Sequence, residues 1–283
     1  MSRVTALVAV LAVATAASAL PASGARPSRI VSLNLCTDQL LLQLVEPARI
    51  AALTYLAADS ELSALADRAR GIPWVRATAE EVLLLRPDLA LAGEYGAKEA
   101  VSALQRWGVP VVQFAPAQSW ADIREQLRRA SEAVQEVEKG EALLDWMNAS
   151  LAALEAHKPA SMPRAIVVQH DGDTYGRDTL MDAVLRSAGF RNLAAELGIV
   201  GYGSISLERI LLAEPDLVIV LDYHADVPTL GRIYLRHPAL RGRSFGRLSL
   251  PAAPLFCGTV ETVRAVQLLV EWRERVVGPR ARP

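Results

Sequence analysis

The chain has 283 residues, a formal net charge of −1 and an apolar fraction of 52%. This length exceeds that of one small domain and suits two lobes, and the apolar fraction excludes an intrinsically disordered chain. The near-neutral charge also excludes nucleic-acid binding as the main function, because such proteins present a strongly basic surface.

Residues 1–25 have the pattern of a cleavable signal peptide. Arg3 supplies the positive start, an uncharged apolar run covers residues 4–19, and small residues at 17–19 or 23–25 suit cleavage. The run is too short to span a bilayer comfortably, and no Cys follows it for lipid attachment. We therefore expect a soluble mature protein in the periplasm; an uncleaved anchor or a buried helix is the alternative.

Residues 26–118 read as a first α/β lobe. Apolar runs predict strands near 29–34, 49–54, 88–92 and 109–114, and helical patterns lie between them, for example at 38–44 and 97–107. Alternation of this kind is typical of a parallel sheet that is covered by helices on both faces.

Residues 119–158 predict one long helix between two lobes. The segment has no Pro, Gly140 alone interrupts it, and apolar residues recur every three or four positions from Ile123 to Leu154. At 1.5 Å per residue this helix would be about 55 Å long. A flexible linker would be rich in Gly and Ser, so we interpret the segment as a stiff spine.

Residues 159–283 read as a second lobe that repeats the first. Strands are predicted near 164–169, 216–221 and 247–250, with a closing helix at 259–276. EEVLLLRPDL at 80–89 is echoed by ERILLAEPDL at 208–217, and RIVSL at 29–33 is echoed by RAIVV at 164–168. One α/β unit used twice predicts two Rossmann-like lobes with parallel sheets.

The chain has two cysteines, Cys36 and Cys257. In an oxidising periplasm they can form a disulfide, but spacing alone does not place them close together. Two separate buried thiols, or a soft-metal site, remain the alternatives.

The sequence lacks the motifs of the common enzyme classes. No Gly-x-Ser-x-Gly elbow is present, and no Gly-x-Gly-x-x-Gly or Walker loop follows the first predicted strand. A nucleophilic pair of Cys36 with His170 is conceivable, but Cys36 has no evident activator. We expect a non-enzyme without catalytic residues or a cofactor; a thiol-based metal-binding or redox protein is the non-transport alternative.

Three segments resemble, in order, recurring blocks of one family. They are RIVSLN, GIPWVRATAEEVLLLRPDLALAG and SISLERILLAEPDLVIVL. The chain resembles the class III periplasmic solute-binding proteins of ABC importers, which serve iron-siderophore, haem and cobalamin uptake. The resemblance implies a monomer with two lobes joined by one long spine helix, and an ABC permease dimer as its partner.

The resemblance also implies where the permease docks. In this family each lobe carries an exposed Glu that binds arginines of the permease, and the matching positions here are Glu80 and Glu208. A carboxylate pairs well with a guanidinium across an interface. The adjacent Glu81 is easily confused with Glu80, and a Glu in the first turn of a helix also suits the helix dipole on its own account.

Ligand contacts are predicted in the loops after the strands, because open α/β sheets bind ligands there. The aromatic and polar residues of these loops are Tyr55, Trp74, Tyr95, His170, Tyr175, Arg177 and Tyr202. Rings offer a large rigid contact area for a corrin or a siderophore shell. His170, Asp171 and Asp173 also suggest a metal cluster, but we favour polar ligand contact and expect no metal site; Trp74 alternatively caps the core of its lobe.

The predicted cargo is a neutral or weakly charged metal chelate. Arg76 and Arg177 are the only basic residues that we place in the cleft, which argues against a trianionic catecholate siderophore. Haem carriers of this type typically have a Tyr in the block that here contains Trp74, which makes haem less suitable. A hydroxamate-type ferric siderophore or cobalamin remains, and the sequence does not separate them.

Overall fold

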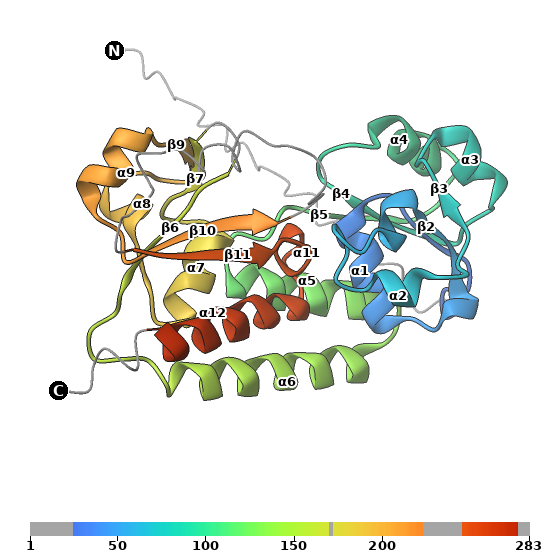
Figure 1. Ribbon diagram of the computed structural model, residues 1–283. Coiled ribbons are helices and arrows are strands. Elements are labelled where there is room, and N and C mark those ends of the chain that lie inside the picture. Colours follow the sequence, from blue (N-terminus) through green and yellow to red (C-terminus); the bar gives the residue numbers. More distant parts are fainter. Residues whose placement is uncertain (1–24, 170–171, 223–244, 277–283) are drawn as a thin grey trace, which may run out of the picture.

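The structure is a computed structural model that describes residues 25–169, 172–222 and 245–276. Figure 1 shows two α/β lobes next to each other, with helix α6 (Val137–Glu155) passing beneath both. We call the lobe before α5 the N-terminal lobe and the lobe after α6 the C-terminal lobe. The predicted signal peptide lies almost entirely outside the described residues. No helix in the described ranges is long and apolar enough to cross a membrane.

The N-terminal lobe is built on a five-stranded sheet of order β3-β2-β1-β4-β5, in which every pair of strands is parallel. Short buried runs of aliphatic residues form these strands, as expected for a sheet with two covered faces. The strands are β1 (Ile30–Ser32), β2 (Ile50–Thr54), β3 (Trp74–Val75), β4 (Leu89–Gly93) and β5 (Val111–Phe114). The helices are α1 (Leu35–Leu44), α2 (Ala66–Ala69), α3 (Ala79–Leu84) and α4 (Lys98–Arg106), with 3-10 turns at Pro47–Arg49 and Tyr55–Ala58.

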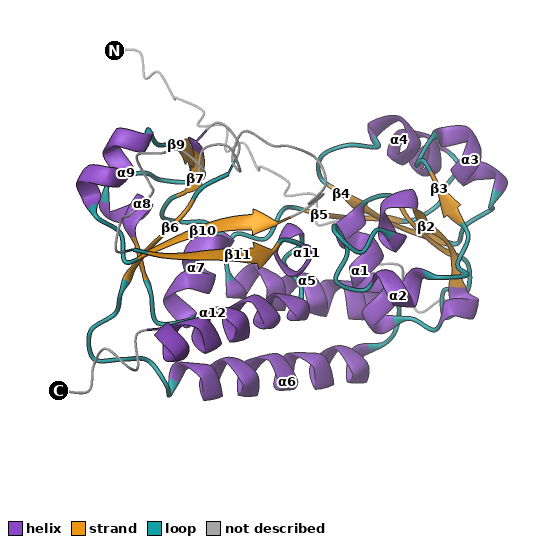
Figure 2. Cartoon of the chain, in the orientation of Figure 1, coloured by secondary structure: helices purple, strands orange, loops and turns teal. Residues whose placement is uncertain are grey.

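The C-terminal lobe has a parallel four-stranded sheet of order β11-β10-β6-β8 and a separate antiparallel ribbon of β7 and β9. Its strands are β6 (Arg164–Val167), β7 (Asp173–Tyr175), β8 (Arg191–Asn192), β9 (Tyr202–Ser204), β10 (Leu217–Asp222) and β11 (Gly246–Pro251). Its helices are α7 (Leu180–Ser187), α8 (Leu193–Glu196), α9 (Leu207–Ala213), α11 (Ala253–Phe256) and α12 (Val263–Val276), with a 3-10 turn at Val260–Thr262. Figure 2 shows both sheets with helices packed around them.

The internal echo corresponds to one structural device used in each lobe. In the first copy, Asp88 accepts the backbone N–H of Arg29 (3.0 Å), and the Arg29 Nε donates to the Leu85 carbonyl at the end of α3 (3.1 Å). In the second copy, Asp216 accepts the N–H of Arg164 (2.8 Å), and the Arg164 guanidinium donates to the Glu214 carbonyl after α9 (2.6 Å).

Both copies also end their helix in the same way. Arg86 and Glu214 adopt left-handed backbone angles, with φ of 46° and 48°. A residue in this conformation terminates an α-helix, and the carbonyls left unpaired there suit a guanidinium donor. The Pro-Asp-Leu that follows then leads into β4 or β10, which confirms the predicted strands at 88–92 and 216–221.

The prediction of one continuous spine helix is wrong. The segment forms α5 (Trp120–Ala133) and α6, separated by a turn in which Gln135 has a left-handed φ of 56°. Arg49 holds this turn: its guanidinium donates to the Val134 carbonyl at 2.7 Å and pairs with Glu136. The two helices then fold back on each other, and Gly140 lies so close to Ser131 that a Cβ there would overlap its side chain.

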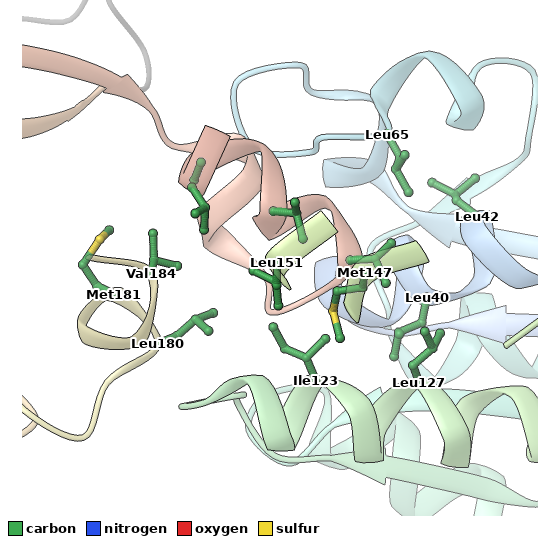
Figure 3. Close-up of a cluster of buried hydrophobic side chains, with 14 of the residues drawn as sticks. Leu40, Leu42, Leu65, Ile123, Leu127, Met147, Leu151, Leu180, Met181 and Val184 are labelled. Carbon is green, nitrogen blue, oxygen red and sulfur yellow. The ribbon is translucent and has the colours of Figure 1, made fainter. Parts of the chain in front are cut away.

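A single apolar core joins the two lobes. One face of each sheet packs against it, through residues such as Ile30 of β1 and Val167 of β6. Figure 3 shows its central part, where α1, α5, α6 and α7 bring together Leu40, Ile123, Leu127, Met147, Leu151 and Leu180. The outer face of each sheet has its own smaller cluster. Because the main core is common to both lobes, large movements between them would expose apolar surface.

Candidate functional site

A cavity of about 370 Å³ lies between the two lobes. Its described walls come mainly from residues at or just after the carboxyl ends of β1, β4 and β5 on one side and of β6, β10 and β11 on the other. In the N-terminal sheet the strand order changes direction between β1 and β4, which is where α/β sheets bind ligands at the carboxyl ends of their strands. Each lobe therefore contributes the edge of its sheet at which ligand binding is expected.

The N-terminal wall is held by the start of α1. Asn34 caps this helix, and its side-chain oxygen accepts the backbone N–H of Cys36 at 2.8 Å. Gly93, at the end of β4, lies against the Asn34 amide, and a Cβ at Gly93 would come within 3.0 Å of it. A larger residue at this position would push against Asn34, and the next two residues, Glu94 and Tyr95, lie on the cavity wall.

The C-terminal wall carries a pair of tyrosines on the β7–β9 ribbon. Tyr175 and Tyr202 are direct partners in the antiparallel register, and their rings meet edge to face with centroids 5.3 Å apart. The Gln169 amide donates to the Tyr175 hydroxyl and so orients that ring. Gly176, next in the chain, approaches the Ile199 carbonyl so closely that any Cβ would overlap it. The ribbon therefore presents two rings in a defined geometry.

A disulfide joins the lobes at the cavity. Cys36 lies at the start of α1 and lines the cavity, and Cys257 follows α11 of the C-terminal lobe. Their Cα atoms are 5.1 Å apart, although 221 positions separate them in the chain. Gly258 follows at once and fits closely against Ala117 and Ile123. The lobes are thus covalently linked beside the ligand cavity.

The described lining is apolar and aromatic, with one charged residue. Phe114, Tyr95, Tyr175, Tyr202 and Phe256 supply rings, and Glu94 is the only charged side chain of the described residues on the wall. No group of three His, Cys, Asp or Glu side chains that could hold a metal ion occurs in residues 25–169, 172–222 and 245–276. The lining therefore offers stacking surfaces and polar contacts for a bulky molecule.

One buried carboxyl lies behind this wall. Asp38 of α1 is fully buried and accepts the backbone N–H of Thr54 at 3.0 Å and its hydroxyl at 2.5 Å. Burial raises the pKa of Asp38 to about 6, although hydrogen bonds from Ser32 and Thr54 oppose this shift. Asp38 ties α1 to the end of β2, and so supports the helix that carries Cys36.

The structure brings together three of the predicted contact residues. Tyr95, Tyr175 and Tyr202 line the cavity, whereas Tyr55, Trp74 and Arg177 do not. Tyr55 directly follows β2 and Trp74 begins β3, and both strands lie on the far side of β1 from the point where the strand order changes direction. Arg76 stacks over the Trp74 ring at 5.3 Å, and Arg177 lies 3.6 Å from Asp178. Cargo contact by these three residues stays a prediction, and His170 lies outside the described residues.

Several wall residues were absent from the sequence prediction. These are Phe114, Gln169 and Phe256. The two strands that carry the predicted Tyr175 and Tyr202 were also not predicted. The strand-end rule pointed to the right edge of each sheet, but β7 and β9 are three residues long and too short for a periodic signal. Phe256 lies on α11 next to a cysteine whose pairing was undecided.

Glu80 and Glu208 occupy equivalent positions at the starts of α3 and α9. Thr78 and Ser206 cap these helices, and each Glu is the second helical residue after its cap. Both side chains are exposed. Glu81 instead turns back and accepts the Arg76 N–H at 2.6 Å, whereas Glu80 forms no such bond with the described residues. The structure therefore distinguishes Glu80 from its neighbour.

Two lobes with parallel sheets, helices that connect them and a ligand cavity between them define a solute-binding protein of the class III type. The family model for periplasmic binding proteins matches residues 30–235. The chain belongs to the periplasmic binding protein family, and its fold is that of the class III members, which serve ABC importers. Members of this family are solute-binding transport proteins and not enzymes.

Relatives and solved structures agree with this assignment. A protein from Halobacterium salinarum named cobalamin-binding protein is 27% identical over 201 residues, which are 68% of this chain and 53% of that one. An uncharacterised ABC transporter substrate-binding lipoprotein of Bacillus subtilis, YvrC, is 28% identical over half of this chain and 48% of its own. The chain thus spans about half the length of the curated relatives that it matches.

Among solved structures, the apo haem-binding protein RhuT from Roseiflexus sp. RS-1 is similar, with a TM-score of 0.68 and 25% identity. The match covers 86% of this chain and 97% of RhuT. The vitamin B12 binding protein BtuF of Vibrio cholerae has a TM-score of 0.66 at 17% identity, over 88% and 98% of the two chains. At that identity the second likeness concerns the fold alone.

Proposed function

We propose that this chain is a periplasmic substrate-binding protein that captures a metal chelate between its lobes and delivers it to an ABC permease, without enzymatic activity. The observation that carries the proposal is the cavity, because aromatic rings from both lobes surround it at the ligand-binding edges of their sheets. A ferric siderophore of the hydroxamate type is the first candidate cargo. Its organic shell offers apolar surface to rings and carbonyl oxygens to amide donors.

The charge of the wall supports a neutral or weakly charged cargo. Glu94 is the only charged side chain of the described lining, so the described wall presents no cation to a trianionic catecholate complex. Burying the negative charge of such a complex beside the Glu94 carboxylate, with no cation to compensate it, would cost binding free energy. A cargo that donates hydrogen bonds, for example through amide groups, would instead find an acceptor in Glu94.

Cobalamin is the second candidate, favoured by the name of the Halobacterium salinarum relative and by the aromatic lining. Its corrin ring and amide side chains suit stacking and hydrogen bonding equally well. Haem is less suitable. Trp74 stands where haem carriers of this type typically have a Tyr and offers no axial ligand, so iron ligation would fall to His170 or to a tyrosine of the wall such as Tyr175.

Delivery to the permease would use Glu80 and Glu208. Each is exposed at the second position of a capped helix, and the two helices lie at the far ends of the upper surface in Figure 1, one on each lobe. Two carboxylates in equivalent places suit a permease dimer that offers two equivalent sites, and arginine is the natural partner for each.

The test is a thermal-shift series on the mature protein with cobalamin, a ferric hydroxamate, a ferric catecholate and haem, followed by calorimetry. A ligand at 100 times its Kd adds about 2.7 kcal/mol of stability, or roughly 5–10 °C in Tm for a chain of this size. We expect a shift with the hydroxamate or cobalamin and none with the catecholate. A catecholate that shifts Tm more than the other three would contradict the neutral-cargo argument, and no shift with any of them would contradict the proposed cargo class.

A further inference from the structure

Two leucines stand out on the surface of the described residues. Leu84 of α3 is 83% exposed and Leu212 of α9 is 85% exposed, more than any other large apolar residue in the described ranges. A lone exposed leucine needs no explanation. These two, however, occupy equivalent positions in the internal repeat, since each follows Glu80 or Glu208 by four residues.

The spacing of four places each leucine on the same helix face as its glutamate. Residues four apart lie one turn from each other along an α-helix, so their side chains project side by side. The buried residue of each helix is on another face: Val82 of α3 and Ile210 of α9 contact the lobe interior. Each lobe thus presents an outward pair of one carboxylate and one leucine, which we call the Glu-Leu face.

We propose that the two Glu-Leu faces are the complete docking contacts for the permease dimer, with Leu84 and Leu212 inserting into apolar pockets beside the groups that pair with Glu80 and Glu208. This inference rests on the proposed transport function. A carboxylate in partial contact with water contributes little binding free energy on its own, and an adjacent apolar side chain excludes water and strengthens the pair.

The duplication indicates a partner with two equivalent sites. Leu84 and Leu212 belong to different lobes, and both copies of the repeat, LLLRPDL and LLAEPDL, have a leucine at this exposed position. A partner with one binding surface would contact one lobe and would require nothing of the other. A two-fold symmetric dimer contacts both lobes through the same kind of surface.

The experiment needs an ABC importer reconstituted in nanodiscs. The importer is selected by testing which candidate shows increased ATP hydrolysis when the wild-type chain is added. The variant Leu84→Ser with Leu212→Ser is compared with Glu80→Ala with Glu208→Ala. The control is Val137→Ser, because Val137 is 49% exposed and lies at the start of α6, beneath the lobes in Figure 1. We expect the leucine variant to raise the Kd for the importer at least tenfold, each single leucine variant to account for part of this, and Val137→Ser to change it less than twofold.

The outcomes separate this inference from the proposed function. A leucine variant that binds the importer like wild type, while the glutamate variant does not, would overturn the inference and leave the docking role of the glutamates intact. An unchanged Kd in the glutamate variant would instead count against the docking assignment itself. Two further measurements test whether the leucines contact something other than the permease. Self-association in sedimentation velocity that the leucine variant loses would assign them to a second copy of the chain and overturn the inference. Vesicle binding in flotation that this variant loses would assign them to the membrane and also overturn it.

Discussion

The two lobes share one set of hydrogen bonds. In the N-terminal lobe, Asp88 accepts the backbone N–H of Arg29 just before β1, and the Arg29 guanidinium donates to a carbonyl at the end of α3. In the C-terminal lobe, Asp216 and Arg164 form the equivalent bonds before β6 and after α9. The lobes differ where they meet the cavity. The N-terminal lobe offers the capped start of α1 and the loop after β4, whereas the C-terminal lobe adds the β7–β9 ribbon with its two tyrosines.

The difference separates two kinds of surface in one molecule. The parts that repeat, α3–β4 and α9–β10, include the two Glu-Leu faces and reach the cavity wall only through Gly93 at the end of β4 and Leu221 near the end of β10. The parts that do not repeat form most of the described wall. A symmetric partner favours repetition, because it presents the same surface twice, while a single asymmetric cargo favours walls that differ. The two lobes are therefore alike in the surfaces that we assign to the permease and unlike in those that we assign to cargo.

The largest expected effect comes from removing the link between the lobes. We expect Cys36→Ser with Cys257→Ser to lower the free energy of unfolding by about 3–5 kcal/mol, because the disulfide closes a loop of 221 positions in the unfolded chain. Urea unfolding measures this, and the variant Cys36→Ala with Cys257→Ala controls for burial of the new hydroxyl groups. A loss below about 1 kcal/mol in both variants would mean that the common core alone holds the lobes together.

The next effect concerns a buried carboxyl of the N-terminal lobe. Asp182, buried in the C-terminal lobe, has Arg186 at 3.2 Å, whereas Asp38 forms no ion pair with the described residues. The pKa of Asp38 is about 6 in the folded protein against 3.8 for an ordinary aspartate, so Asp38 stays protonated to a higher pH in the folded state than in the unfolded chain. Stability is therefore lost as pH rises from about 4 to 6, by up to about 3 kcal/mol.

Asp38→Asn tests this sign, because the variant has no proton to lose. We expect its free energy of unfolding, relative to wild type, to increase as the pH rises from 4 to 7 in urea titrations. Parallel curves for the two proteins across this range would show that Asp38 titrates at the same pH in the folded and unfolded states.

The smallest effect sharpens the comparison of the two cavity walls. With the cargo that gives a thermal shift, we expect Tyr202→Ala to weaken binding by about 1–3 kcal/mol, roughly 5- to 150-fold in Kd, because the ring loses its stacking area. Trp74→Ala is expected to weaken binding less, because Trp74 lies outside the cavity lining and stacks on Arg76. Calorimetry decides this, and a larger loss in the Trp74 variant would move the cargo toward the outer edge of the N-terminal lobe.

Much of the fold follows from local sequence. Apolar runs before and after Pro-Asp-Leu predict β4 and β10, and the spacing of apolar residues predicts α5, α6 and α12 as helical, because these signals depend on residues close together in the chain. The equivalence of Glu80 and Glu208 is likewise readable, since repetition is visible in the letters themselves. Two α/β units with a Glu at matching positions were therefore predictable from the sequence alone, whereas the exposure of each Glu was implied by the family resemblance.

Other features depend on contacts that no local pattern contains. The break between α5 and α6 depends on Arg49, which is distant in sequence and stabilises the left-handed turn at Gln135. Cys36 meets Cys257 because the common core brings the two lobes together. Tyr95 lines the cavity and Tyr55 does not because β1 and β4 are neighbours at the point where the strand order changes direction. Sequence determined the units and their repetition; tertiary structure decided the pairings, because those depend on how distant segments pack.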